Sequence, residues 1–295
     1  MISYQYKQAY PFVNGVATAQ NFDGKWCILR ERGRVQQFLD YDHLSEPRSS
    51  VMVSTLNGLK GVQSIYGPEI FMPTYKSVSI IDSSTFIFKD QGLYGLWSRG
   101  GYILHPEYEK MYEPARGCLR VREDGKYYYL HGEGYKSKKG PYDRAVDFHY
   151  DNTVVKTPEG YQLIDSAFNI INSLPYAKVD YLGEEKWKYK EGGKWGVLSS
   201  AGEVLCAAEY ELMNRYQEGR LAVSVDDKWG YLDEHGQLVI PMKYPLAWDY
   251  VGGKARFIYD RGIGFIDKSG KKIIDDKFYE VRDFHNGRAR FQSLR

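Results

Sequence analysis

The sequence predicts an all-β protein of about eight tandem repeats, each a three-stranded unit of 34 residues. Three observations favour this fold class. Four columns of residues recur at one spacing along nearly the whole chain. Each period contains three short apolar runs separated by polar turns, and no segment has a convincing helical periodicity.

The four columns stay in phase with one another. Neighbouring members of the first column, a glycine or its substitute, are 34 residues apart except for one step of 33. A large residue precedes each member, a second glycine column follows six residues later, and an aromatic residue stands near fourteen residues later. In chain order the first column comprises Cys27, Gly61, Gly95, Tyr128, Gln162, Gly196, Gly230 and Gly264.

The clearest repeat covers residues 219–250 and indicates where the strands lie. We predict strands at 221–225, 229–232 and 238–240, because each run is short, apolar and bounded by turn residues. The second turn ends in Gly236, which can adopt the positive φ that a tight hairpin needs.

The end of this repeat is expected to be irregular. Proline cannot donate to a ladder, so we expect Pro241 to end the third strand. A connector with Tyr244, Trp248 and Tyr250 then leads to the next repeat.

The second strand of each repeat is predicted to be buried on both faces. The residue after the first-column position is apolar in every repeat, and the next residue is apolar in all but one, where Gln63 stands. Neighbouring strand residues point to opposite faces of a sheet. We therefore expect small sheets stacked face to face, with Trp26, Trp195 and Trp229 between them.

At these residues the chain resembles the bacterial WG (KWG) β-repeat family. The resemblance is carried by Lys-Trp-Gly followed by an apolar pair, most clearly at 193–198 and 227–232, and it covers essentially residues 1–295. It implies an all-β repeat scaffold that serves interactions, and almost nothing about activity. The fourth and fifth repeats depart most from the motif, with Tyr127-Tyr128 and Tyr161-Gln162 in place of Trp-Gly.

The ends of the chain favour an open arrangement. We interpret residues 1–295 as one continuous array, with an N-terminal partial repeat at 1–13 and a C-terminal partial repeat at 286–295. An overhang at both ends favours an open superhelical array whose partial repeats act as caps. The alternative is a closed, propeller-like ring of eight units.

Composition limits the partners and the compartment. A net charge of +2 gives no basis for binding nucleic acid or a membrane by charge alone. No apolar run approaches the ~20 residues of a membrane helix, and the first residues do not form a secretory signal. We expect a cytoplasmic protein, or an exported one if a signal segment has been removed.

Cysteine, histidine and acidic residues give no pattern of a chemical site. Cys27, Cys118 and Cys206 occupy three different positions of the repeat, so we expect buried, reduced thiols. The histidines lack metal-ligand spacing, and adjacent acids rarely act as a general acid–base pair. We therefore predict no catalytic residue, no cofactor and no metal.

The candidate partner-binding residues are basic and aromatic. The segment 132–140 is glycine-rich but lacks the Gly-Lys-Ser/Thr order of a phosphate-binding loop, so we interpret it as a turn. What remains is a basic cluster that could contact an acidic partner, and an aromatic residue outside the repeat columns. The five candidates are Lys136, Lys138, Lys139, Arg144 and Trp248.

Two function classes remain, with an enzyme as a weaker third. We expect a non-catalytic scaffold that binds another protein or a peptide, because repeats align similar surfaces and loops along the chain. The alternative is a glycan-binding module that uses exposed tyrosine and tryptophan. An enzyme would need convergent polar groups with shifted pKa values, and the sequence offers no such set.

Overall fold

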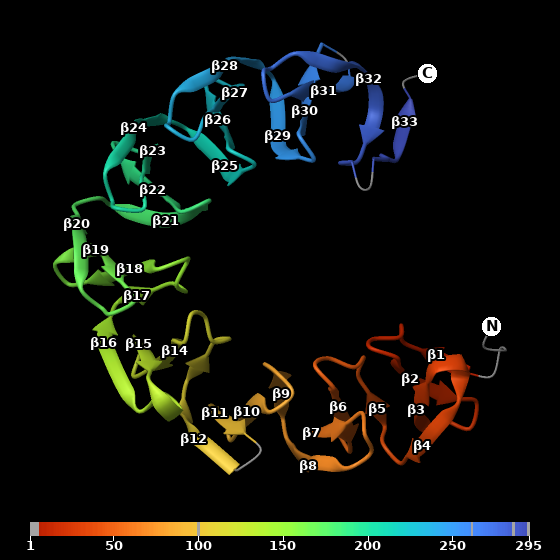
Figure 1. Cartoon of the computed structure of the whole chain (residues 1–295). Helices are drawn as coiled ribbons and strands as arrows, with labels where there is room; N and C mark the ends of the chain where they lie inside the picture. The colour runs from red at the N-terminus through yellow and green to blue at the C-terminus, as the bar shows by residue number, and fades with distance from the viewer. Residues whose placement is uncertain (1–5, 99–100, 261, 285–286, 294–295) are drawn as a thin grey trace. The chain divides into compact units, whose positions relative to one another are not determined.

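The computed structural model describes residues 6–98, 101–260, 262–284 and 287–293. Within these ranges the chain is all-β and forms eight antiparallel sheets that follow one another along the sequence (Figure 1). Each sheet has four strands, apart from the last, which has five. The described residues form no α-helix, and their two helical turns are the short 3-10 segments η1 (Glu31–Gly33) and η2 (Glu133–Tyr135). The all-β prediction is therefore confirmed.

The chain divides into two compact units, Met1–Asp147 and Phe148–Arg295. The strands of the first unit are β1 (Tyr6–Ala9), β2 (Val16–Asn21), β3 (Trp26–Arg30), β4 (Val35–Leu39), β5 (His43–Leu44), β6 (Val51–Leu56), β7 (Leu59–Ser64), β8 (Glu69–Tyr75), β9 (Ser77–Ile80), β10 (Thr85–Asp90), β11 (Leu93–Ser98), β12 (Gly101–Tyr108), β13 (Lys110–Met111), β14 (Leu119–Glu123), β15 (Lys126–His131), β16 (Ser137–Tyr142) and β17 (Arg144–Ala145).

The second unit continues the same order. Its strands are β18 (Asn152–Thr157), β19 (Gly160–Asp165), β20 (Ile170–Leu174), β21 (Lys178–Gly183), β22 (Lys186–Glu191), β23 (Lys194–Leu198), β24 (Val204–Tyr210), β25 (Leu212–Gln217), β26 (Arg220–Val225), β27 (Lys228–Leu232), β28 (Leu238–Tyr244), β29 (Leu246–Val251), β30 (Lys254–Tyr259), β31 (Gly262–Asp267), β32 (Lys272–Val281) and β33 (Phe291–Ser293).

The prediction of three strands per repeat is wrong, because the connector is itself a strand. Residues expected to be irregular form β29, which pairs with β30 from Leu246↔Ile258 to Val251↔Lys254. The register shifts between Ala247 and Tyr250, so the period-two pattern of the connector is broken and is hard to recognise in the sequence.

The expectation that Pro241 ends the third strand is also wrong. Pro241 lies inside β28, which is the last strand of its sheet and pairs only with β27. An edge strand tolerates proline, because the missing N–H can face away from the ladder.

A bulge in the last strand of the sheet explains the glycine column. In the repeat of β27 and β28 the register shifts between Trp229 and Tyr231, opposite Gly230. A Cβ on Gly230 would lie 2.5 Å from the carbonyl oxygen of Ile240 and 3.0 Å from the backbone nitrogen of Met242. The bulged strand therefore approaches so closely that only glycine fits.

The exceptions to the column follow the same rule. At Cys27 and Gln162 the last strand of the sheet pairs in register and shifts only after the next residue, so it leaves room for a side chain. At Tyr128 the bulge is present, but the bulged strand carries Gly140, whose Cβ would lie 2.8 Å from the Tyr128 ring. In the fourth repeat the glycine therefore lies on β16 instead of β15, and the two strands still approach each other closely.

Neighbouring sheets bury their apolar faces against each other. In the second unit one core cluster joins the faces of two successive sheets and includes Trp229, Tyr231, Tyr250 and Phe257. Tyr231 and its neighbour on the strand, Leu232, are both 0% exposed, so the prediction of a strand covered on both faces is confirmed. Trp26 and Trp229 are buried as expected.

Trp195 differs from these two tryptophans in being only half-buried. The ammonium groups of Lys188 and Lys190 lie 4.7 and 5.3 Å from its ring centroid.

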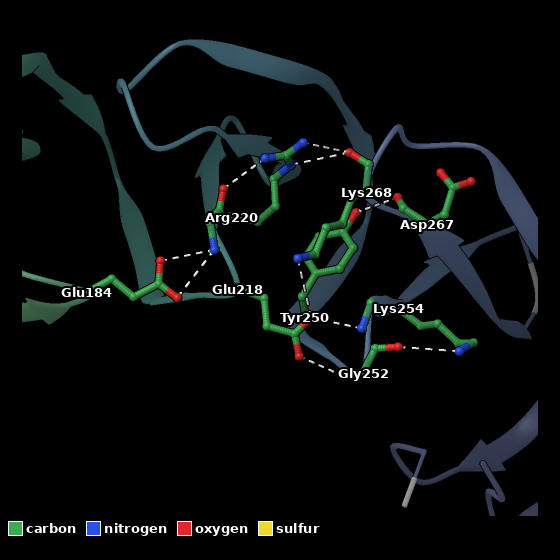
Figure 2. Close-up of polar contacts among 10 residues, drawn as sticks. Glu184, Glu218, Arg220, Tyr250, Gly252, Lys254, Asp267 and Lys268 are labelled. Carbon is green, nitrogen blue, oxygen red and sulfur yellow. Dashed lines mark hydrogen bonds and ion pairs between the residues drawn. The ribbon is translucent and has the colours of Figure 1, made fainter. Parts of the chain in front are cut away.

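Acidic side chains connect successive sheets of the second unit across one repeat (Figure 2). The Glu184 carboxylate accepts the N–H of Gly219 at 3.0 Å. One repeat later, Glu218 accepts the N–H groups of Gly252 and Gly253 at 2.7 and 2.8 Å. Each acceptor satisfies backbone donors of the next hairpin turn, so we call these contacts the glutamate clips.

Two arginines form a second kind of contact between segments distant in the sequence, one in each unit. In the first unit Arg120 donates to both carboxylate oxygens of Asp147 at 2.9 and 3.1 Å and stacks 3.6 Å from the Tyr112 ring centroid. In the second unit Arg256 donates in the same way to Asp283 at 2.7 and 3.0 Å. Such bidentate pairs fix geometry as well as charge.

The partial repeats supply strands to the first and last sheets. β1 pairs with β2 and completes the first sheet, and β33 pairs with β32 as a fifth strand of the last. Parts of the two predicted partial repeats, residues 1–5, 286 and 294–295, lie outside the described residues. No helix in the described ranges is long and apolar enough to cross a membrane.

Candidate functional site

The predicted basic residues lie near one another in the chain but differ in exposure and in the face to which they point. Lys136 follows η2 and is exposed, while Lys138 and Lys139 are neighbours on β16 and so point to opposite faces. The Lys138 ammonium contacts the Glu123 carboxylate and lies 4.2 Å over the Tyr128 ring. Arg144, on β17, is half-buried.

The fifth predicted residue, Trp248, belongs to the second unit. It lies on β29 and is half-buried, and the Arg256 guanidinium covers its ring at 4.8 Å from the centroid. Its carbonyl oxygen accepts the Tyr231 hydroxyl at 2.8 Å. Trp248 therefore has a packing role next to the Arg256 pair, and its proposed role in binding stays a prediction.

The thiols have the environment of structural groups. Cys27 and Cys118 are buried and Cys206 is half-buried, and all three are free. Burial raises the pKa of each thiol, which disfavours the reactive thiolate. Within the described part of the chain, no three His, Cys, Asp or Glu side chains are placed to hold a metal ion.

An aromatic cavity opens between two neighbouring sheets of the first unit. Its volume is about 410 Å³. Trp97, on β11, lines the cavity. Its ring packs against the rings of Phe71 and Phe86, with ring-centroid distances of 5.2 and 5.8 Å. Tyr66 comes from the turn after β7 and is 66% exposed. The lining residues are Ser64, Tyr66, Pro68, Ile70 and Trp97.

The turn that carries Tyr66 is fixed by the residue that breaks the apolar pattern of the second strand. Gln63 is 1% exposed, and its amide donates to the carbonyl oxygens of Ser64 and Gly67. The Tyr41 hydroxyl donates to Gln63 Oε1 at 3.1 Å. A buried amide with its partners in place holds the turn in one conformation.

An arginine cavity of about 490 Å³ lies beside the hairpin turn between β1 and β2. The chain leaves β3 through η1, where Arg32 has a φ of 62° and is exposed. The segment from Arg30 to Arg34 therefore places three guanidinium groups around one turn. The lining residues are Asn14, Gly15, Arg30, Glu31, Arg32 and Arg34.

Arg30 links the two cavities. Its guanidinium donates to Gln36 Oε1 at 2.5 Å and to the Ile65 carbonyl oxygen at 3.2 Å. The same group lies 5.7 Å from the centroid of the Tyr66 ring, which lines the aromatic cavity. The two cavities are thus adjacent: Arg30 lines the arginine cavity and contacts Tyr66, which lines the aromatic cavity.

Sequence reasoning missed most of this surface. A signal was present in the three arginines at 30, 32 and 34 around the second-column glycine, and in Gln63 as the polar exception of its strand. Trp97 stood at a position where all but one of the other repeats have leucine or isoleucine, which marks it as unusual without showing that it lines a cavity.

The fold and these surfaces define a tandem β-repeat protein. Glycine, aromatic and turn residues recur at equivalent positions of successive sheets. The family model described as "WG containing repeat" matches residues 1–26, 98–127, 195–229, 229–260 and 263–293, together just over half of the chain. The chain therefore belongs to the WG repeat family, as the motif predicts. No curated protein matches it.

Solved structures with some similarity are distant. A computationally designed protein, Ika8, has 11% identity and a TM-score of 0.36, with 89% of this chain and 93% of that chain covered. A eukaryotic initiation factor has 10% identity, a TM-score of 0.47 and coverages of 93% and 88%. Hsv2 of Kluyveromyces lactis has 8% identity, a TM-score of 0.38 and coverages of 76% and 94%. At these TM-scores the similarities carry no argument about this chain.

Proposed function

We propose that this protein is a non-catalytic repeat scaffold that binds another protein or a peptide. The observation that carries the proposal is the aromatic cavity, in which the exposed Tyr66 and the firmly packed Trp97 face a hollow between two sheets. Tyrosine and tryptophan are enriched among the residues that contribute most to protein interfaces, because they bury a large area at a low entropic cost.

The side chains of the cavities support binding better than catalysis. Among the described residues that line the aromatic and arginine cavities, the titratable groups are arginine, tyrosine and a single carboxylate, Glu31. General acid–base chemistry needs paired groups whose pKa values are pushed apart. The Ser64 hydroxyl accepts the N–H of Tyr66, a turn contact that supports structure.

For the arrangement of the sheets we propose an open superhelical array of repeats, with a closed ring as the alternative. Support comes from the partial repeats, which complete the first sheet and add a fifth strand to the last. Stacked repeats bury their faces against neighbours and need capped ends. For the location we propose the cytoplasm, with export after removal of a signal segment as the alternative.

The scaffold proposal is tested with the intact chain. The wild-type protein and the Tyr66→Ser variant are used as bait under photo-crosslinking in extracts of the source cell. We expect a specific macromolecule to be recovered with the wild type and reduced with the variant. The proposal is wrong if the wild-type chain recovers no macromolecule above a denatured-bait control.

A glycan is the second candidate ligand, because exposed aromatic rings also stack on sugars. Tyr66 and Trp97 are the side chains that favour it. Binding on a glycan array that is lost with Tyr66→Ser, together with no recovered protein, would replace the protein partner by a glycan.

A further inference from the structure

We propose that the arginine cavity and the aromatic cavity form one site for an acidic peptide, a segment with carboxylates next to an aromatic or aliphatic side chain. The inference rests on the proposed function, because it names the class of peptide that the scaffold binds. It is carried by the juxtaposition of the two cavities across Arg30.

Charge favours carboxylates at one end of the site. The arginine cavity has three guanidinium groups, from Arg30, Arg32 and Arg34, and one carboxylate, Glu31. Arg32 and Arg34 are exposed, so a ligand can reach them. Guanidinium groups bind carboxylates through two parallel hydrogen bonds, which adds direction to the attraction.

The other end fits an apolar side chain. Pro68, Ile70 and Trp97 form apolar walls, and Tyr66 adds an exposed ring at the boundary with Arg30. An aromatic or aliphatic side chain placed there would exchange water for contact with these surfaces. A carboxylate beside that side chain in sequence would meet the arginines.

The site is held in place before a ligand arrives. Gln36 and the Ile65 carbonyl oxygen hold the Arg30 guanidinium, and Gln63 holds the turn that carries Tyr66. Groups that are already ordered lose less conformational entropy on binding, so more of the contact energy remains as affinity.

A peptide suits this site better than a nucleic acid. The arginines gather at one end of the site, whereas nucleic-acid binding needs cations that follow a phosphate backbone. The net charge of the chain is +2, which is small for a protein of that class.

The test is fluorescence anisotropy with the full chain and a labelled synthetic peptide in which glutamates flank a phenylalanine. Two comparison peptides carry lysine for glutamate or serine for phenylalanine. Arg32→Glu/Arg34→Glu is one variant and Tyr66→Ser the other. Their matched controls are Lys194→Glu/Lys228→Glu, with the same change in charge at the exposed first residues of β23 and β27, and Tyr279→Ser, since Tyr279 is 69% exposed.

We expect the acidic aromatic peptide to bind, and the arginine variant to weaken it by about ten-fold or more, with a strong salt dependence. Tyr66→Ser should weaken binding as the serine-for-phenylalanine peptide does, and both controls should bind as the wild type. The site assignment is overturned if the peptide fails to bind, if the control variants weaken binding equally, or if a single-stranded DNA oligonucleotide binds better.

These outcomes are separate from failure of the scaffold proposal. A partner that is recovered equally by the wild type, the Tyr66→Ser variant and the arginine variant would leave the scaffold role intact and would move binding to another surface. Recovery of no partner, with no peptide bound, would remove both proposals.

Discussion

At the scale of single residues, the fold depends on how closely two backbones can approach. Gly230 faces the carbonyl oxygen of Ile240 across the bulge, and in the fourth repeat Gly140 provides the same space from the other strand. In the repeats with this bulge, the shared feature is therefore the close approach of the two strands rather than the glycine itself. At Tyr128 the glycine of the motif is missing, but the bulge and the close approach of the two strands are still present.

Gly230→Ala should destabilise the second unit, because the new Cβ would meet backbone atoms that cannot move aside independently. The expected loss is about 1–3 kcal/mol of unfolding free energy, the usual cost of overpacking. Urea unfolding measures it. The control is Gln162→Ala in the same column, where β20 pairs in register at Gln162↔Ser173 and the expected change is within about 0.5 kcal/mol. Equal losses at both positions would contradict the bulge explanation.

Gln63→Leu would restore the apolar pattern of its strand and should nevertheless destabilise the first unit. The substitution removes the amide that donates to the Gly67 carbonyl oxygen, whereas the Ser64 carbonyl oxygen keeps the Gly67 N–H and the Tyr41 hydroxyl keeps Glu69 as partners. Leaving a buried polar group unpaired costs about 1–3 kcal/mol. Amide exchange in the turn that carries Tyr66 should accelerate. A more stable variant with unchanged exchange would show that leucine is simply a better core residue here.

At the scale of elements, the successive hairpins are connected by contacts that span one repeat. Glu218 shows how they work. Burial acts to raise its pKa, but the N–H donors of Gly253 and Gly252, with Lys268 at 3.6 Å, outweigh burial and lower the pKa below 4.5. A carboxyl group with a lowered pKa in the folded state stabilises that state when ionised.

The Glu218 clip should therefore stabilise the second unit above about pH 4.5 and lose its effect as the pH falls through the lower folded-state pKa. Glu218→Gln should reduce stability at pH 7 and should converge with the wild type in acid. Chemical denaturation at a series of pH values measures this difference. Glu203→Gln, at an exposed position of the same unit, is the control and should show no such convergence. A gap between wild type and Glu218→Gln that is constant with pH would rule out the clip.

At the scale of the whole molecule, the period was visible in the sequence because most repeats share the same turns and the same close approach of two strands. The connector strands were not visible. β25 and β29 pair with their neighbours through shifted registers, so their side chains follow no simple alternation. The aromatic cavity could not be predicted either, because Tyr66 and Trp97 meet only through contacts between sheets one repeat apart.

The proposed open array makes a prediction that needs no partner. A compact protein of 295 residues has a radius of gyration of about 19 Å, and a closed ring should lie near that value, because its first and last sheets would pack together. An open array should exceed it by several Å in small-angle X-ray scattering. Donor and acceptor dyes on Lys7→Cys and Gln292→Cys, with the half-buried Cys206 replaced by serine, add a second measurement. Low transfer efficiency is expected, since a gap would separate the end sheets. Efficient transfer with a compact radius would instead establish the ring and would place β33 beside the first sheet.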